Sequence, residues 1–166
     1  MNETIFHVDG NKLIIERTFS ASKELVWDAW ENPEVFCKWW GPHGWTTRVK
    51  ESEFKAGGNR LYGMRCEDVN QVDWYGKESW GKMSFQTVTP KDAFTYTDYF
   101  TDEQGNVTEG MPVVRTENTL ETVDGGTKFT STGYYNSEED LKTVIDMGME
   151  AGIKQTWDRL ESLIGE

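Results

Sequence analysis

The pattern of apolar residues changes its period several times along the chain. Residues 12–19 follow a period of two, in which Leu13, Ile15, Arg17 and Phe19 alternate with the other four positions, and this is typical of a strand. Between residues 20 and 40 the apolar positions recur at helical spacing, and serines near the start can cap a helix. Asn32-Pro33 interrupts this stretch. Because proline is favoured in the first turn of a helix, we expect two short helices here.

Residues 45–133 consist of short strand-like runs separated by turns that are rich in glycine, proline and aspartate. Asp124-Gly125-Gly126, between two such runs, is a strong hairpin signal. The predicted strands of this region cover residues 46–54, 59–67, 80–88, 94–101, 112–123 and 127–132.

The C-terminal part of the chain returns to helical spacing. Ser137 is followed by three acidic residues, a combination that is typical of a helix start. Apolar residues then keep the helical spacing from Leu141 to Ile164. We therefore expect one long helix of about seven turns.

Together these elements predict an α+β fold with a single domain. An antiparallel sheet of six to seven strands needs cover on one face, and only the last helix has an apolar stripe long enough to provide it. We expect a curved sheet wrapped round the long C-terminal helix, with two short helices after the first strand. Such a layout leaves a cavity wherever the helix does not fill the curve of the sheet.

Three stretches resemble one known family. ERTFSASKELVWDAWENPEVFCKWWGP, KAGGNRLYGM and MGMEAGIKQTWDRLESLI are similar to the homologues of the activator of the 90-kDa heat-shock-protein ATPase. This family belongs to the START-like, or birch-pollen-allergen-like (SRPBCC), superfamily. The chain departs from the usual pattern at Met149, where the family has Trp, and at Ser22, where it often has Pro. The resemblance covers residues 12–164 and implies a helix-grip fold, with residues 1–166 as one START-like domain.

The candidate functional residues are those expected to line the cavity or its mouth. Aromatic and methionine side chains can line an apolar pocket, but they can equally be plain core. The loop WWGPHGW (39–45) could rim the mouth, although a histidine there could simply be exposed. The predicted cavity residues are Trp40, His43, Trp45, Tyr62, Met64, Trp80, Tyr96, Asn118, Met147, Gly148 and Met149.

Composition argues against several classes of function. The chain has 29 acidic and 17 basic residues, a formal charge of −12, which disfavours a nucleic-acid partner. No apolar run is long enough for a membrane span, and no secretory signal is visible. With only two cysteines, Cys37 and Cys66, we expect a cytoplasmic protein without a disulfide framework. The sequence predicts no particular oligomeric state.

Catalytic and metal-binding motifs are also missing from the sequence. His7 and His43 are the only histidines, and neither phosphate-binding nor nucleophile motifs occur, so we expect no metal, no cofactor and no catalytic residue. A cyclase-like reaction would need a polar group inside the cavity. The candidates for that group are Arg60, Tyr62, Asp98, Arg115 and Asn118.

Three functions follow from these observations and from the resemblance. The first is non-enzymatic binding of a small hydrophobic molecule between the sheet and the C-terminal helix. The second is stimulation of a chaperone ATPase, which the resemblance and the acidic charge suggest. The third is a cyclase- or hydrolase-type reaction in the same cavity.

Overall fold

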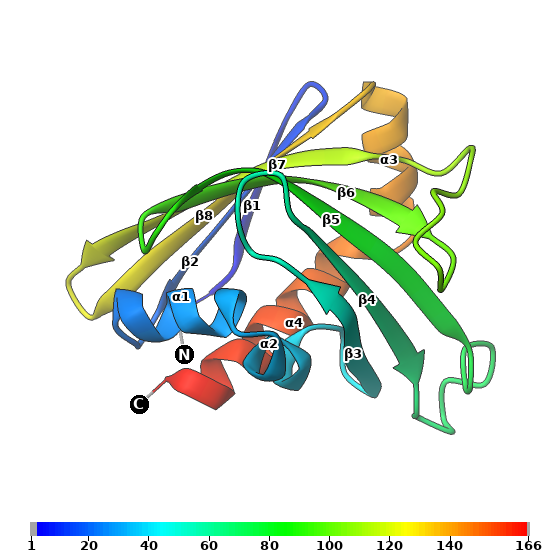
Figure 1. Ribbon diagram of the computed structural model, residues 1–166, viewed down its shortest axis with the longest axis horizontal. Coiled ribbons are helices and arrows are strands. Elements are labelled where there is room, and N and C mark those ends of the chain that lie inside the picture. Colours follow the sequence, from blue (N-terminus) through cyan, green and yellow to red (C-terminus); the bar gives the residue numbers. More distant parts are fainter. Residues whose placement is uncertain (1–2, 166) are drawn as a thin grey trace.

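The fold is built on one curved antiparallel sheet with helices against its concave face (Figure 1). A computed structural model describes residues 3–165. The eight strands are ordered β1-β2-β8-β7-β6-β5-β4-β3, so β1 and β3 are the two edges and the sheet is not closed. Their bounds are β1 Ile5–Asp9, β2 Lys12–Phe19, β3 Trp45–Ser52, β4 Asn59–Cys66, β5 Glu78–Thr89, β6 Ala93–Thr101, β7 Val114–Val123 and β8 Gly126–Tyr135.

The alternation that predicted β2 is confirmed. Its residues alternate between half-buried and buried positions, and Leu13, Ile15, Arg17 and Phe19 face the interior. The predicted strand count was too low, because β1 makes an eighth strand and the two short helices follow the second strand rather than the first. β1 pairs only with β2 and is mostly exposed, so it lacks the buried alternate positions that reveal a strand in a sequence.

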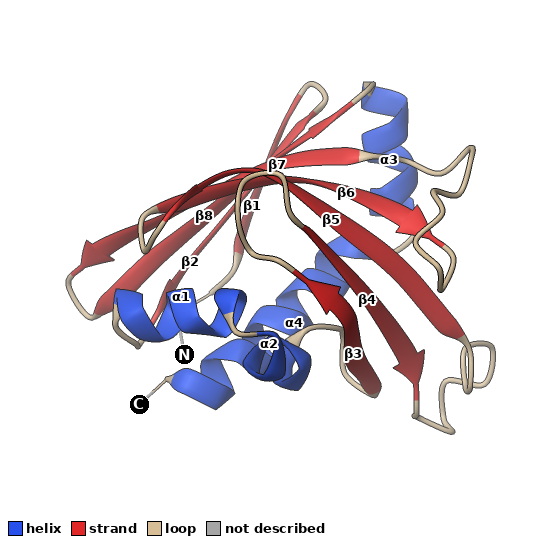
Figure 2. Cartoon of the chain, viewed as in Figure 1, coloured by secondary structure: helices blue, strands red, loops and turns tan. Residues whose placement is uncertain are grey.

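The two short helices lie where Asn32-Pro33 divides the helical pattern. α1 (Lys23–Glu31) begins at Ser22, whose hydroxyl accepts a hydrogen bond from the Leu25 N–H. α2 (Pro33–Trp39) follows directly, with the Asn32 side chain accepting from the Glu34 N–H. Because these caps satisfy free N–H groups, each helix can start within a few residues of the previous element. Figure 2 shows both helices at one end of the concave face.

The C-terminal region forms two helices, not the single long helix predicted. α3 (Glu138–Asp146) starts at Ser137, whose hydroxyl accepts from the Asp140 N–H. α4 (Met149–Ile164) follows after Gly148, which has a φ of 90°. This left-handed conformation is strained for any residue with a side chain, so glycine allows the chain to turn here. α4 then crosses beneath the sheet towards α1 and α2 (Figure 1).

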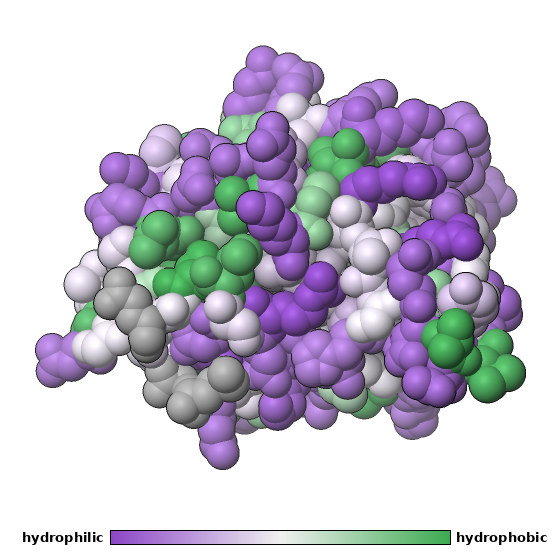
Figure 3. Space-filling model, turned by 90° about the horizontal axis from the view of Figure 1, so that it is seen from below, coloured by the Kyte–Doolittle hydropathy of each residue, from purple (hydrophilic) through white to green (hydrophobic). Residues whose placement is uncertain are grey.

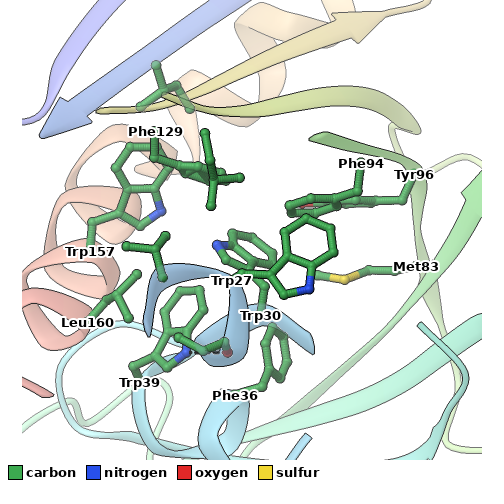
Figure 4. Packing of buried hydrophobic residues seen from close by; sticks show 14 of the residues in the cluster. Trp27, Trp30, Phe36, Trp39, Met83, Phe94, Tyr96, Phe129, Trp157 and Leu160 are labelled. Atoms are coloured by element: carbon green, nitrogen blue, oxygen red, sulfur yellow. Dashed lines mark hydrogen bonds between the residues drawn. The ribbon is translucent and has the colours of Figure 1, made fainter. Parts of the chain in front are cut away.

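Aromatic side chains fill the space between the sheet and the helices α1 and α2. Trp30 lies at the centre, with its ring centroid 5.1 Å from those of Trp39 and Phe94 and 5.4 Å from that of Phe129. Trp157 of α4 also packs against Phe129, and their ring centroids are 5.4 Å apart (Figure 4). Rings this close bury large apolar areas, so this cluster is the main core of the molecule.

Candidate functional site

A cavity of about 310 Å³ remains between the concave face of the sheet and α4. Beyond the aromatic cluster, the sheet curves away from the helix and the protein's own side chains do not fill the space. The first turns of α4 border the cavity through Met149, Gly152 and Ile153. A Cβ atom added at Gly152 would meet nothing within 4 Å, so this glycine leaves the helix surface open on that side.

The cavity wall contains six of the eleven predicted residues, namely Trp40, Tyr62, Met64, Trp80, Tyr96 and Met149. Met64 follows Tyr62 by two positions on β4, and alternate residues of a strand share a face. Tyr96 lies on β6 at the level of Thr116 of β7, which also borders the cavity. The sheet therefore brings together residues that the sequence scatters over some 50 positions.

Trp80 borders the cavity, but its indole packs on the convex face of the sheet. It pairs with Gly63, and a Cβ at Gly63 would lie 2.6 Å from the indole, so the ring lies flat across that position. On the same face, the Arg48 guanidinium is 5.1 Å from the indole centroid and the Glu78 carboxylate accepts from the indole N–H. Trp80 therefore contributes to the wall only as part of the strand.

The other five predicted residues lie outside the cavity wall. The His43 side chain is exposed, and the Trp45 indole N–H donates to Gln71. Asn118 is buried in the core, where its amide donates to the Phe94 carbonyl and to the Thr116 hydroxyl. Met147 is 60% exposed at the end of α3, and Gly148 forms the turn into α4. The prediction failed for these last two because it assumed an unbroken helix.

Asp98 is the one charged residue in the cavity wall, among the residues that the structure describes. It lies on β6, and its two carboxylate oxygens both accept from the Tyr62 hydroxyl at 3.0 Å. Burial raises the pKa of Asp98 to about 7, against the smaller opposing effect of the Tyr62 hydrogen bond. A carboxyl that titrates near neutral pH within an apolar cavity is the main chemical feature of the site.

Three tyrosines share the surroundings of Asp98. Burial and then the nearby Asp98 raise the pKa of Tyr62 well above its usual value, and the same two causes raise the pKa of Tyr135 to about 12. The pKa of Tyr96 is also raised, first by burial and then by Asp98. These phenols therefore stay protonated at neutral pH and can donate hydrogen bonds.

The remaining polar candidates lie elsewhere. Arg60 is fully buried, and its guanidinium donates to the carbonyls of Trp30 and Glu31 at the end of α1 and to the Ser52 hydroxyl. Burial lowers its pKa to about 10. Arg115 is exposed and pairs with Glu117. Of the five polar groups proposed from the sequence, the cavity wall holds Tyr62 and Asp98.

Sequence reasoning missed the role of Arg159. Its guanidinium donates to the carbonyls of Gly41 at 2.8 Å and Trp45 at 3.1 Å, with further contacts to the carbonyls of Lys38, Trp40 and Pro42. This side chain therefore fixes the loop after α2, including Gly41 and Pro42 of the cavity wall, to α4. The resemblance marked both sequences involved, WWGP and WDRL, but no spacing rule connects them.

Two features are absent from residues 3–165, the part of the chain that the structure describes. No helix in this range is long and apolar enough to cross a membrane. No three histidine, cysteine, aspartate or glutamate side chains gather there in a way that could hold a metal ion.

From the side of the helices, the surface is mostly hydrophilic, with apolar side chains gathered in separate patches (Figure 3).

Solved structures with this architecture come from several bacteria. Protein Ms6760 from Mycobacterium smegmatis is 28% identical with a TM-score of 0.84, over 97% of this chain and 94% of that chain. A protein from Arthrobacter aurescens is also 28% identical with a TM-score of 0.84, over 95% of this chain and 88% of that chain. A protein from Staphylococcus epidermidis is 29% identical with a TM-score of 0.82, over 96% and 92%.

Comparison with the curated proteins gives no match. A family model does match, and it covers residues 20–165, which include both short helices, strands β3–β8 and the two C-terminal helices. The family is described as "Activator of Hsp90 ATPase homolog 1-like protein". The match confirms the resemblance seen in the three sequence stretches, and the chain belongs to this family.

Proposed function

We propose that the protein binds a small, mostly apolar molecule in the cavity between the sheet and α4. The observation that carries this proposal is an open volume of about 310 Å³ with aromatic and aliphatic walls. Ligand sites usually range from about 300 to about 1,000 Å³, so this cavity suits a small ligand. Burial of apolar surface drives such binding, at roughly 25 cal/mol per Å² before the costs of association.

Titration with an uncharged fluorophore, N-phenylnaphthylamine, tests this proposal. The probe fluoresces strongly only in apolar surroundings, so occupancy of the cavity gives a saturable increase with one site per chain. Native mass spectrometry of the same mixture gives the stoichiometry. A wild-type protein that shows no saturable signal and no bound probe would contradict the proposal.

Two substitutions at Gly152 localise the binding. Gly152→Trp places an indole in the open space beside α4, and we expect it to abolish probe binding. Gly152→Ala is the matched control, because one methyl group leaves most of the cavity free. If the tryptophan variant folds and still binds the probe as the wild type does, the ligand lies elsewhere.

A second candidate function is proton-transfer catalysis, which the position of Asp98 favours. A carboxyl with a pKa of about 7 can act as a general base near neutral pH. Nitrobenzisoxazole, a flat aromatic reagent, tests this capacity. A base removes its ring C–H proton, the electron pair forms the nitrile, and the N–O bond breaks to give a coloured cyanonitrophenolate. We expect a rate that rises with pH through about 7 and is lost in Asp98→Asn. A wild-type rate equal to the buffer rate would rule out this role.

A further inference from the structure

The charge inside the cavity is unbalanced. Among the described residues of the wall, Asp98 is the only charged one, and no lysine, arginine or histidine accompanies it. The buried Arg60 donates to carbonyls of α1 and is not part of the wall. An ionised carboxylate in apolar surroundings is costly without a cation or several hydrogen bonds.

The hydrogen bonds of Asp98 leave part of its capacity unused. The Tyr62 hydroxyl supplies one proton shared between the two oxygens, and the Tyr99 backbone supplies another hydrogen bond. An ionised carboxylate can accept about four. Asp98 is partly buried and borders the cavity, so a bound molecule can reach its side chain.

The other groups that face Asp98 do not supply a positive charge. Tyr62 on β4, Tyr96 on β6 and Tyr135 on β8 are neutral phenols at ordinary pH. Trp30 of α1 and Trp40, the residue directly after α2, border the cavity. α4 presents only uncharged residues, namely Met149, Gly152, Ile153, Thr156 and Trp157.

Aromatic faces favour a cation in such a site. An ammonium group is attracted to the face of a tryptophan or tyrosine ring, and the attraction grows when water is excluded. The formal charge of −12 adds a field that draws cations and repels anions. An anionic ligand such as a fatty acid would find no basic partner in the wall and would meet the Asp98 carboxylate.

We propose that the cavity selects an apolar amine, whose ammonium group binds the Asp98 carboxylate while its apolar body fills the space below the sheet. This inference rests on the proposed binding function and narrows it to one class of ligand. It makes Asp98 the specificity-determining residue and gives Tyr62 the role of holding the carboxylate in place.

Three naphthalene ligands of different charge test this selection. Naphthylmethylamine is a cation, naphthylmethanol is neutral, and naphthoate is an anion, and each competes with bound N-phenylnaphthylamine. At about pH 8 Asp98 is mostly ionised, whereas an alkylamine with a pKa near 9–10 stays protonated. We expect the amine to bind about 10-fold or more tightly than the alcohol, as for a charge-assisted hydrogen bond, and naphthoate to bind worst.

The pH profile of the wild type provides a test without any substitution. Between about pH 5.5 and about pH 8.5 the ratio of amine to alcohol affinity should rise as Asp98 ionises, with a midpoint near or below its pKa of about 7. Asp98→Asn should abolish both the preference and its pH dependence, so that naphthylmethylamine binds no more tightly than naphthylmethanol at any pH in this range. Tyr62→Phe removes a hydrogen bond that lowers the Asp98 pKa, so it should move the midpoint upward.

The possible outcomes separate the two proposals. If the alcohol and the amine bind equally well at all pH values, or if naphthoate binds best, the amine inference is wrong and apolar binding stands. If none of the three ligands displaces the probe but the probe itself binds, the amine inference also fails. If the probe does not bind either, the proposed function fails with it.

Discussion

At the scale of single residues, the charged groups of the interior differ in their partners and in whether they border the cavity. Arg17 pairs with Asp158 at 2.6 Å, and Arg60 and Arg159 donate to backbone carbonyls at helix ends and in the loop after α2. Arg17 has a charged partner, although its Nε and Nη2 atoms make no hydrogen bond, and Arg60 and Arg159 each donate to several neutral acceptors. Asp98 has only neutral donors. A charge left without a counterion beside an open volume is better explained by ligand binding than by stability.

The unpaired Asp98 predicts how stability depends on pH. Its pKa is about 7 in the folded protein and about 3.9 in an unfolded chain, so folding favours the protonated form. The associated stability is fully present below about pH 4 and is lost as the pH rises through about 7. The full difference between the two pKa values corresponds to at most roughly 4 kcal/mol.

Asp98→Asn removes this loss, because asparagine does not ionise. We expect the variant to gain up to roughly 4 kcal/mol relative to the wild type between pH 4 and pH 8. Urea denaturation of both proteins at the two pH values measures the change. Any change that the substitution makes to the Tyr62 hydrogen bond affects the variant at both pH values. The change with pH of the stability difference between the two proteins therefore reports the ionisation of Asp98. A difference between the two proteins that does not vary with pH would contradict the raised pKa.

At the scale of elements, the break between α3 and α4 is set by Gly148. Its φ of 90° is accessible to glycine at little cost, whereas most other residues avoid it. Gly152, one turn later, lies inside α4 with open space beside it. The two glycines look alike in the sequence, but one makes a turn and the other keeps a helix face bare.

Alanine at each of these glycines should therefore have opposite effects. Gly148→Ala should destabilise the protein by about 1 kcal/mol, because the left-handed conformation is strained for alanine. Gly152→Ala should stabilise it by up to about 1 kcal/mol, because alanine is the better helix former and the methyl group meets no neighbour. Thermal unfolding of the two variants measures both changes in stability. A loss of stability in both would mean that the two positions do not differ in this way.

The contacts of Arg159 lead to a second prediction at this scale, which concerns the stability of the loop after α2. Arg159→Met keeps the aliphatic stem but removes the donors to five carbonyls around the loop after α2. We expect a loss of about 2–3 kcal/mol and faster amide hydrogen exchange across residues 40–46. Arg159→Lys is the matched control. It should recover only part of the lost stability, since one ammonium group cannot reach all five carbonyls. Unchanged exchange in the methionine variant would show that the loop does not depend on this arginine.

The elements differ in how far the sequence predicts them. β2, α1 and α2 follow from strong local signals, namely a period of two, serines that can cap the start of α1, and Pro33 in the first turn of α2. The break at Gly148 could not be predicted from the sequence, because the apolar spacing continues through it and only the backbone conformation shows the turn. The face on which Trp80 lies also depends on pairing β5 with β4, and strand register is a tertiary property.

At the scale of the whole molecule, the cavity follows from how the sheet and α4 fit together. The sequence predicts the presence of the sheet, the helix and an excess of aromatic residues. Which aromatic residues form the core and which border the cavity depends on the curvature of eight strands and on where α4 crosses them. The unusual chemistry of Asp98 likewise could not be predicted from the sequence. It occupies an ordinary strand position, and only the packing around it makes it unusual.

The excess of acidic residues predicts how the whole molecule responds to salt. With a formal charge of −12, repulsion between carboxylates opposes the folded state, and surface ion pairs such as Lys142–Asp146 offset little of it. Raising the ionic strength from about 0.01 M to about 0.15 M shortens the Debye length from about 30 Å to about 8 Å and screens that repulsion. We therefore expect the melting temperature to rise by a few degrees in sodium chloride. A matched solution of a neutral osmolyte separates screening from general solute effects. A melting temperature that falls with salt would mean that the surface ion pairs outweigh the net repulsion.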